Sequence, residues 1–149
     1  MTQESVWDRE YKKSKLLTKD NKPQADVVRF VHYLNDLRLE IKDLNVLDLG
    51  SGTGRNSYYF AELGAKVTGF EISKTAIQIA KEYQQNELLK HPVTNIRYIV
   101  YLQKSIGNIF PIADSSVDIV LDVTSSNSLS EVEREVYLTE RNKLKKDVG

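Results

Sequence analysis

Three glycines at alternate positions form the part of the sequence with the clearest chemical meaning. Gly50, Gly52 and Gly54 follow the apolar run of residues 45–49, where a buried strand is expected to turn into a helix. Only glycine lets a backbone turn that sharply and lie against a ligand without a Cβ in the way. The first amides of the following helix would face the bound molecule. The spacing therefore predicts a ligand-binding loop at residues 50–54.

Two carboxylates flank this loop and indicate what kind of ligand it holds. Asp48 stands two residues before Gly50, where a negative charge disfavours a pyrophosphate and favours a ligand that bears positive charge. S-adenosylmethionine is such a ligand, because it carries both an ammonium and a sulfonium. Glu71 ends a second apolar run, 17 residues after Gly54, where it can accept hydrogen bonds from two ribose hydroxyls. The next residue, Ile72, can pack on the adenine.

The elements that must position these residues alternate between strands and helices. Short apolar runs predict four strands, at residues 45–49, 66–71, 96–102 and 117–122. Helical spacing predicts a helix with Pro23 in its first position, a short helix over residues 55–63 and a longer helix capped by Ser73. Ser130 and Glu133 form a capping box for a last helix. This alternation implies an α/β fold with a parallel sheet covered by helices on both faces.

The same segments resemble the class I S-adenosylmethionine-dependent methyltransferases. Residues 46–54 are similar to the first motif of that family, residues 69–73 to its second, and residues 110–120 to its approach to strand four. The helix that ends in residues 144–149 resembles the segment before strand five. The resemblance implies a Rossmann-like, doubly wound sheet of seven strands in the order 3-2-1-4-5-7-6. This chain would supply strands one to four and stop before strand five.

The resemblance also implies which residues hold the cofactor, S-adenosylmethionine. The chain departs from the family at the end of strand three, where many relatives carry an acidic residue for the adenine amino group. Here the sequence reads Ser105-Ile106-Gly107-Asn108, and the backbone amides of Ser105 and Ile106 are expected to substitute. Asp122, at the end of strand four, matches a position that borders cofactor and substrate in the family, or else it caps a helix. The predicted cofactor-binding residues are Asp48, Gly50, Ser51, Gly52, Gly54, Glu71, Ile72, Ser105, Ile106 and Asp122.

Composition and length indicate a single domain without cysteine chemistry. Lys plus Arg and Asp plus Glu number 21 each in 149 residues, so no net charge attracts nucleic acid or an anionic membrane. The absence of cysteine excludes disulfides, thiolate metal sites and cysteine nucleophiles. With no signal segment or membrane span in the sequence, we expect a cytoplasmic protein. Residues 1–44 are expected to form a helix and an N-terminal lid, and residues 45–149 the cofactor-binding core. Within the lid, Trp7, Asp8 and Tyr11 resemble the N-terminal lid of many members of the family.

The expected chemistry needs few catalytic side chains. Methyl transfer from a sulfonium is an in-line displacement, so the protein mainly aligns the acceptor and excludes water. Asp122 is a candidate base for a hydroxyl or amine acceptor. His32 and His91 have no partner at ligand spacing, and no metal site is predicted. Residues 122–127 (DVTSSN) lack the prolines and the aromatic that stack a flipped adenine in amino-directed nucleic-acid methyltransferases. Nucleic acid is therefore disfavoured as the acceptor. Of the two classes that remain, a small molecule is favoured slightly over a protein side chain.

Two other functions stay open. A nicotinamide-dependent oxidoreductase would use a similar sheet and loop, although Arg55 follows Gly54 where no further glycine supports that fingerprint. The second alternative is a non-catalytic cofactor-binding module or fragment, because four strands are fewer than the family's seven. Residues 117–122 would then form an apolar edge strand, which predicts self-association through that edge.

Overall fold

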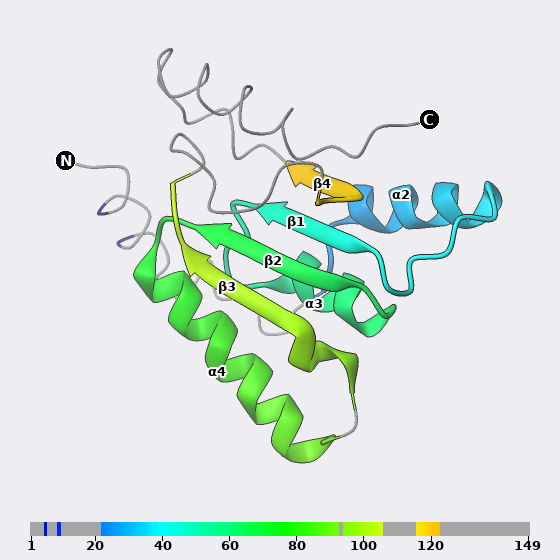
Figure 1. The fold of residues 1–149 in the computed structure, drawn as a ribbon. Helices are drawn as coiled ribbons and strands as arrows, with labels where there is room; N and C mark the ends of the chain where they lie inside the picture. The colour runs from blue at the N-terminus through cyan, green and yellow to red at the C-terminus, as the bar shows by residue number, and fades with distance from the viewer. Residues whose placement is uncertain (1–4, 6–8, 10–21, 93, 106–115, 123–149) are drawn as a thin grey trace, which may run out of the picture.

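Four parallel strands form the centre of the chain. The structure, a computed structural model, describes residues 5, 9, 22–92, 94–105 and 116–122. Its elements are α2 (Ala25–Asp36), β1 (Asn45–Leu49), α3 (Arg55–Glu62), β2 (Lys66–Glu71), α4 (Lys74–Lys90), the 3₁₀ helix η2 (Asn95–Tyr98), β3 (Ile99–Gln103) and β4 (Ile119–Asp122). The strands are ordered β3-β2-β1-β4 (Figure 1), which confirms the predicted order of the first four.

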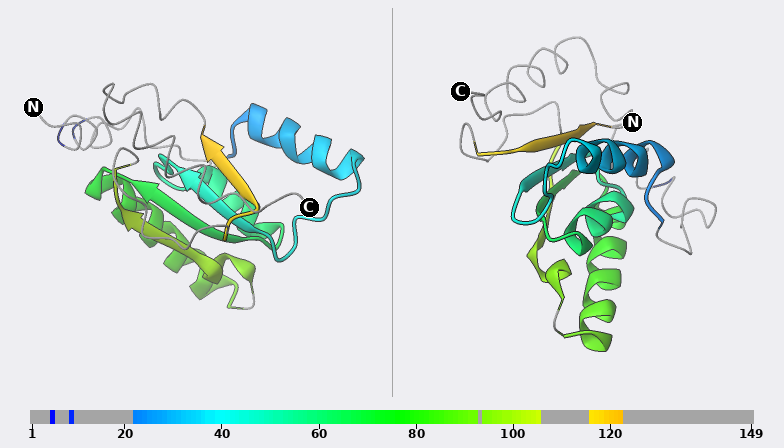
Figure 2. Two further views of the ribbon diagram at one scale, coloured as in Figure 1. Left: turned by 45° about the horizontal axis from the view of Figure 1, so that its top comes forward. Right: turned by 90° about the vertical axis from the view of Figure 1, so that its right-hand side faces the viewer.

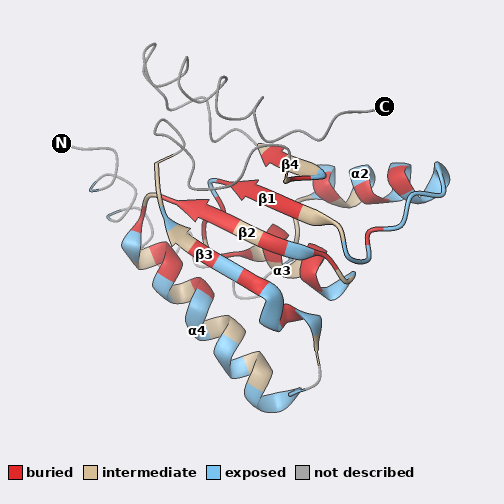
Figure 3. Cartoon of the chain, viewed as in Figure 1, coloured by how far each residue is buried: buried red, intermediate tan, exposed pale blue. Residues whose placement is uncertain are grey.

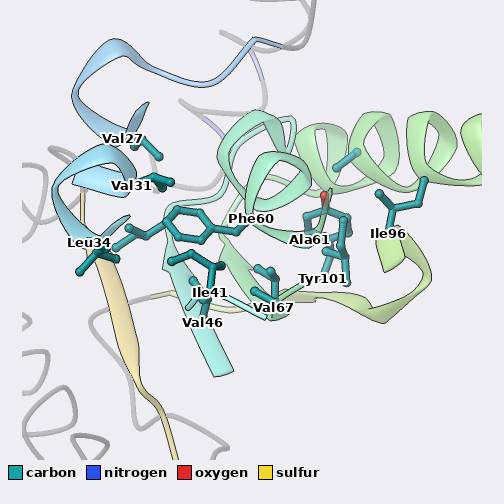
Figure 4. Close-up of a cluster of buried hydrophobic side chains, with 14 of the residues drawn as sticks. Val27, Val31, Leu34, Ile41, Val46, Phe60, Ala61, Val67, Ile96 and Tyr101 are labelled. Atoms are coloured by element: carbon teal, nitrogen blue, oxygen red, sulfur yellow. The ribbon is translucent and has the colours of Figure 1, made fainter. Parts of the chain in front are cut away.

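The three described α-helices lie on one face of this sheet (Figure 2). Their buried side chains pack with those of the strands in one cluster, in which Val31 of α2 and Phe60 of α3 join Val46 of β1 (Figure 4). Burial of such apolar side chains is the main favourable contribution to folding. Because α2 shares this core, the helix that precedes the first strand belongs to the same packed unit as the sheet.

The opposite face of the sheet is buried as well. Leu47, Leu49 and Phe70 are at most 1% exposed and form a second cluster with Val117. Successive residues of a strand point to opposite faces, so Leu47 and Leu49 lie on this face while Asp48 between them points to the helices. Figure 3 shows β1 and β2 buried along most of their length, as expected for central parallel strands.

Most of the predicted elements form where the sequence places them. β1 and β2 have the predicted bounds, and α3 begins at Arg55 as expected. Ser73 caps α4, because its hydroxyl accepts a hydrogen bond from the amide of Ala76 (3.1 Å).

The first helix begins later than predicted. Pro23 was expected in the first helical position, but α2 starts at Ala25 and Gln24 is its N-cap with an extended backbone. Asn56 of α3 explains the difference, because its side chain accepts a hydrogen bond from the Gln24 amide (3.0 Å) and donates one to the Gln24 side chain (2.9 Å). This pair of bonds holds Gln24 out of the helix.

The third and fourth strands also begin later than predicted. Residues 96–98 were assigned to a strand but belong to η2, and β3 starts at Ile99. The Gln84 side chain of α4 donates hydrogen bonds to the carbonyls of Ile96 (2.7 Å) and Ile99 (3.2 Å), which favours the turn over an extended ladder. β4 starts at Ile119, two residues after the predicted start. Just before it, the Asp118 carboxylate accepts a hydrogen bond from the amide of Asn45 (2.8 Å).

Several predictions fall outside the described residues: the lid residues Trp7, Asp8 and Tyr11, and the capping box of Ser130 and Glu133. β4 is the outer strand at its end of the described sheet, and self-association through it stays a prediction. None of the helices in the described part of the chain has the length and hydropathy that a membrane crossing requires.

Candidate functional site

The three glycines of the loop all adopt the left-handed backbone that favours glycine. Their φ angles are +70° at Gly50, +58° at Gly52 and +89° at Gly54. The amides of Gly50 and Ser51 both donate to the carbonyl of Phe70 (2.8 and 2.9 Å), so the loop is fastened to the end of β2. Gly54 is the N-cap of α3, and the sharp strand-to-helix turn predicted from the glycine spacing is confirmed.

Glu71 connects the glycine loop to the start of α4. Its carboxylate accepts hydrogen bonds from the amide of Gly52 (2.9 Å) and from the amide of Ser73 (2.8 Å), and the residue is only 5% exposed. Charge-assisted bonds of this kind are about twice as strong as neutral ones. A carboxylate offers about four acceptor positions, so holding the loop and binding ribose hydroxyls are compatible roles.

Asp48 lies on the face of the sheet that α3 covers. The Ser57 hydroxyl of α3 donates a 2.7 Å hydrogen bond to its carboxylate, and Asp48 is 4% exposed. Burial raises the pKa of Asp48 to about 6; the Ser57 bond opposes this rise, the charge of Glu71 adds to it and Arg55 lowers it. Asp48 is therefore ionised at neutral pH and changes its charge close to physiological pH.

The other predicted site residues lie near the carboxyl ends of the strands, apart from Ile106, which lies outside the described residues. Ile72 follows β2 directly, and Ser105 lies two residues beyond β3; both are half-buried. Asp122 is the last residue of β4 and is registered opposite Leu49, the last residue of β1. The candidates thus meet at one edge of the sheet, where open parallel sheets bind ligands.

Sequence reasoning missed side chains that lie next to the predicted site residues on the helix-covered face of the sheet. Ser57 was not predicted, because nothing in the spacing shows that its hydroxyl reaches Asp48. Tyr101 of β3 was missed because its place beside the loop depends on the register of three strands. The Ser51 hydroxyl is buried without a hydrogen-bond partner among the described residues, which marks an unfilled polar position in the loop.

Metal ligands do not gather in this region. His32 is exposed on α2, and His91 is exposed at the end of α4. In the described ranges, no three His, Asp or Glu side chains come together in a way that could hold a metal ion.

A match to a known family identifies the class of protein in which this site occurs. Residues 47–147 match the family described as methyltransferase domain. The chain belongs to this methyltransferase family. The family confirms S-adenosylmethionine as the cofactor expected from the sequence, and it argues against the nicotinamide-dependent alternative.

Curated relatives of the methyltransferase domain act on different kinds of acceptor. The chain is 32% identical over 120 residues to a release factor glutamine methyltransferase of Fusobacterium nucleatum, covering 79% of this chain and 31% of the relative. It is 30% identical over 105 residues to a ubiquinone biosynthesis O-methyltransferase of Coxiella burnetii, covering 66% of this chain and 43% of the relative. The chain therefore spans less than half the length of either relative.

A solved structure shows the same fold. A SAM-dependent methyltransferase from Aquifex aeolicus superposes with a TM-score of 0.64 at 21% sequence identity, covering 89% of this chain and 66% of that one. The four parallel strands with their helices therefore form part of a class I methyltransferase fold, as the resemblance implied.

The residues at the sheet edge fit the cofactor. Glu71 supplies a buried carboxylate for hydroxyl groups, and Asp48 supplies negative charge below the loop. The glycine loop presents backbone without Cβ atoms, and Ser51 holds a buried hydroxyl that lacks a partner among the described residues. This set of groups suits an uncharged ribose and a cationic sulfonium better than a phosphate.

Proposed function

We propose that the sheet edge binds S-adenosylmethionine and that the chain transfers its methyl group to a small-molecule acceptor. The proposed contacts are the predicted set, Asp48, Gly50, Ser51, Gly52, Gly54, Glu71, Ile72, Ser105, Ile106 and Asp122. The observation that carries the proposal is the hydrogen bond from the Gly52 amide to Glu71. This bond joins the glycine loop to the carboxylate that would hold the ribose. When bound, the cofactor supplies the electrophilic methyl group.

The protein's own contribution to this reaction is alignment. Glu71 would hold the ribose, and the loop would fix the rest of the cofactor against the ends of β1 and β4. Asp122 would stand at the acceptor side and take a proton from a hydroxyl or amine. Holding donor and acceptor in line removes much of the entropic barrier of a bimolecular displacement.

Binding preference tests the cofactor assignment. We expect the purified chain to bind S-adenosylmethionine and S-adenosylhomocysteine at least about tenfold more tightly than NAD, because Asp48 and Glu71 repel a pyrophosphate. Isothermal titration calorimetry with the three ligands at one pH and salt concentration measures this difference. Tighter binding of NAD than of either sulfur nucleotide would overturn the proposal.

Removal of the ribose carboxylate should weaken binding strongly. Glu71→Ala is expected to reduce cofactor affinity by about 1–3 kcal/mol, since hydrogen bonds to a buried charged group are lost. Glu82→Ala, which removes an exposed glutamate of α4, is the matched control and should leave the affinity unchanged. Equal affinity of folded Glu71→Ala and the parent in the same titration would remove Glu71 from the site.

The class of acceptor can be tested by following a labelled methyl group to the molecule that receives it. The curated relatives include a methyltransferase of protein glutamine and one of ubiquinone biosynthesis, so both acceptor classes occur among similar chains. Incubation of the chain with methyl-labelled cofactor and a cell extract should place the label in an acid-soluble product that chromatography separates from the cofactor. Label in the precipitated protein would favour a protein acceptor, and no transfer above a Glu71→Ala control would favour a binding module.

A further inference from the structure

A row of three residues crosses the sheet beneath the glycine loop. Asp48 of β1 is registered opposite Gly69 of β2, and Gly69 is registered opposite Tyr101 of β3. Residues opposite each other in a parallel sheet point to the same face, which here is the face of α3 and α4. Because Gly69 has no side chain, the space between Asp48 and Tyr101 stays open for other groups, and Ser51 of the loop enters it.

The packing at this point is tight. A Cβ on Gly69 would lie 2.9 Å from the Cβ and Oγ of Ser51 and 3.0 Å from the ring of Tyr101. A Cβ on Gly54 would lie only 2.3 Å from the hydroxyl of Tyr101. The Tyr101 hydroxyl therefore occupies the space directly beside the last glycine of the loop, at the start of α3. Figure 4 shows the ring of Tyr101 as part of the same buried cluster as Ala61 and Ile96.

The environment of Tyr101 keeps its hydroxyl protonated. Burial is the main cause that raises its pKa well above the usual range, and the negative charge of Asp48 adds to it. Tyr101 is 5% exposed, and no described residue is bonded to its hydroxyl. The Tyr101 hydroxyl therefore acts on the loop by filling the space beside Gly54, and it does so in its neutral form.

We propose that Tyr101 is a positioning residue for cofactor binding, whose hydroxyl fills the space beside Gly54 and so supports the glycine loop without touching the cofactor. The inference rests on the proposed function, because it gives Tyr101 a role in binding the same cofactor. The groups that act on the pKa of Asp48 are Ser57 and Arg55 from α3 and Glu71 from β2, and Tyr101 is not among them. None of these is changed when the Tyr101 hydroxyl is removed, so its effect can be isolated.

The first test removes this hydroxyl and keeps the ring. Affinity of the parent for S-adenosylmethionine should fall as the pH drops below about 6, because Asp48 then takes up a proton. Tyr101→Phe should lower the affinity at pH 7.5 by about fivefold, because the loop can move into the space that the hydroxyl leaves. The midpoint of the pH dependence should stay the same, because the groups that set the pKa of Asp48 are unchanged. Tyr98→Phe, which removes a hydroxyl from an exposed tyrosine three residues earlier, is the control and should change neither value. An unchanged affinity in Tyr101→Phe would overturn the proposal.

The second test needs no cofactor. Gly54→Ala should lower the melting temperature in the parent, both through the positive φ and through the contact with the Tyr101 hydroxyl. The φ cost is the same in the Tyr101→Phe background, but the 2.3 Å contact is gone, so Gly54→Ala should lower the melting temperature by less. Contacts at 3.0 Å with the ring and 3.3 Å with Ala80 remain and limit the rescue.

The outcomes of the two tests separate this inference from the proposed function. A parent that binds neither S-adenosylmethionine nor S-adenosylhomocysteine would contradict the proposed function, while the melting temperatures would still report on the contact between Gly54 and Tyr101. Equal losses of melting temperature for Gly54→Ala in both backgrounds would contradict the support given by Tyr101. A smaller loss in the Tyr101→Phe background, together with the lower affinity of Tyr101→Phe for the cofactor, supports it.

Discussion

Replacement of Gly52 with valine is expected to reduce S-adenosylmethionine affinity by at least about 100-fold. Gly52 has a φ of +58°, where a side chain costs about 1–2 kcal/mol and a β-branched one more. Its amide also donates the 2.9 Å bond that fixes the loop to Glu71, and a shift of the backbone would break that bond. The new side chain would further occupy space that the cofactor needs. These effects add to more than the loss expected for Glu71→Ala.

Gly64→Ala provides the control for backbone strain. Gly64 has a φ of +100° and lies just before β2, at the end of the sheet away from the loop. Its substitution should lower the stability of the fold without changing the affinity of the folded protein. Titration calorimetry on Gly52→Val, Gly64→Ala and the parent measures the difference. A folded Gly52→Val protein that binds within about threefold of the parent would show that the cofactor does not lie on this loop.

Asp48→Asn is expected to stabilise the ligand-free protein at neutral pH. The pKa of Asp48 is raised from 3.8 to about 6, so the folded state holds its proton more tightly than the unfolded state. The stability that Asp48 contributes is therefore complete below its unfolded pKa and is lost as the pH rises through about 6. About two pKa units at 1.36 kcal/mol each give an upper limit of about 3 kcal/mol. The amide donors of asparagine also need partners, so we expect a gain of about 1–2 kcal/mol at pH 7.5 and none at pH about 4.

Urea unfolding of the two proteins at both pH values measures this gain, with Asp36→Asn on exposed α2 as a control that should change little. Loss of stability of equal size at both pH values would show that the carboxylate is not strained by burial. The same substitution should weaken the binding of S-adenosylmethionine more than the binding of S-adenosylhomocysteine, because only S-adenosylmethionine carries the sulfonium charge. A buried carboxylate that reduces stability and improves binding is a common compromise at functional sites.

The sequence predicted the elements whose limits are set by local signals. β1 ends at Leu49, just before Gly50, and β2 ends at Glu71. Ser73 caps α4 through its own hydroxyl. The positive φ angles of the loop also follow from local chemistry, since Gly52 and Gly54 adopt a backbone that other residues avoid. These features could be predicted because their causes lie within a few residues.

The predictions that failed depend on contacts between distant residues. Pro23 did not begin α2, because Asn56, 32 residues after Gln24, bonds that residue outside the helix. The start of β3 moved to Ile99, because Gln84 bonds two carbonyls near its beginning. The support that Tyr101 and Ser57 give to the site was invisible for the same reason, since strand register and helix packing bring them to Gly54 and Asp48.

The proposed cofactor site lies between the glycine loop and the carboxyl end of β2. Amide chemical shifts of the ¹⁵N-labelled chain, recorded while S-adenosylhomocysteine is added, test it at single residues. We expect the largest shifts at the amides of Gly50, Gly52 and Ser73, because the last two bond the Glu71 carboxylate that would receive the ribose. Gly64 and His91, which lie away from this edge, should not shift. Shifts concentrated at Gly64 or His91, with the loop amides unchanged at saturation, would contradict the proposed site.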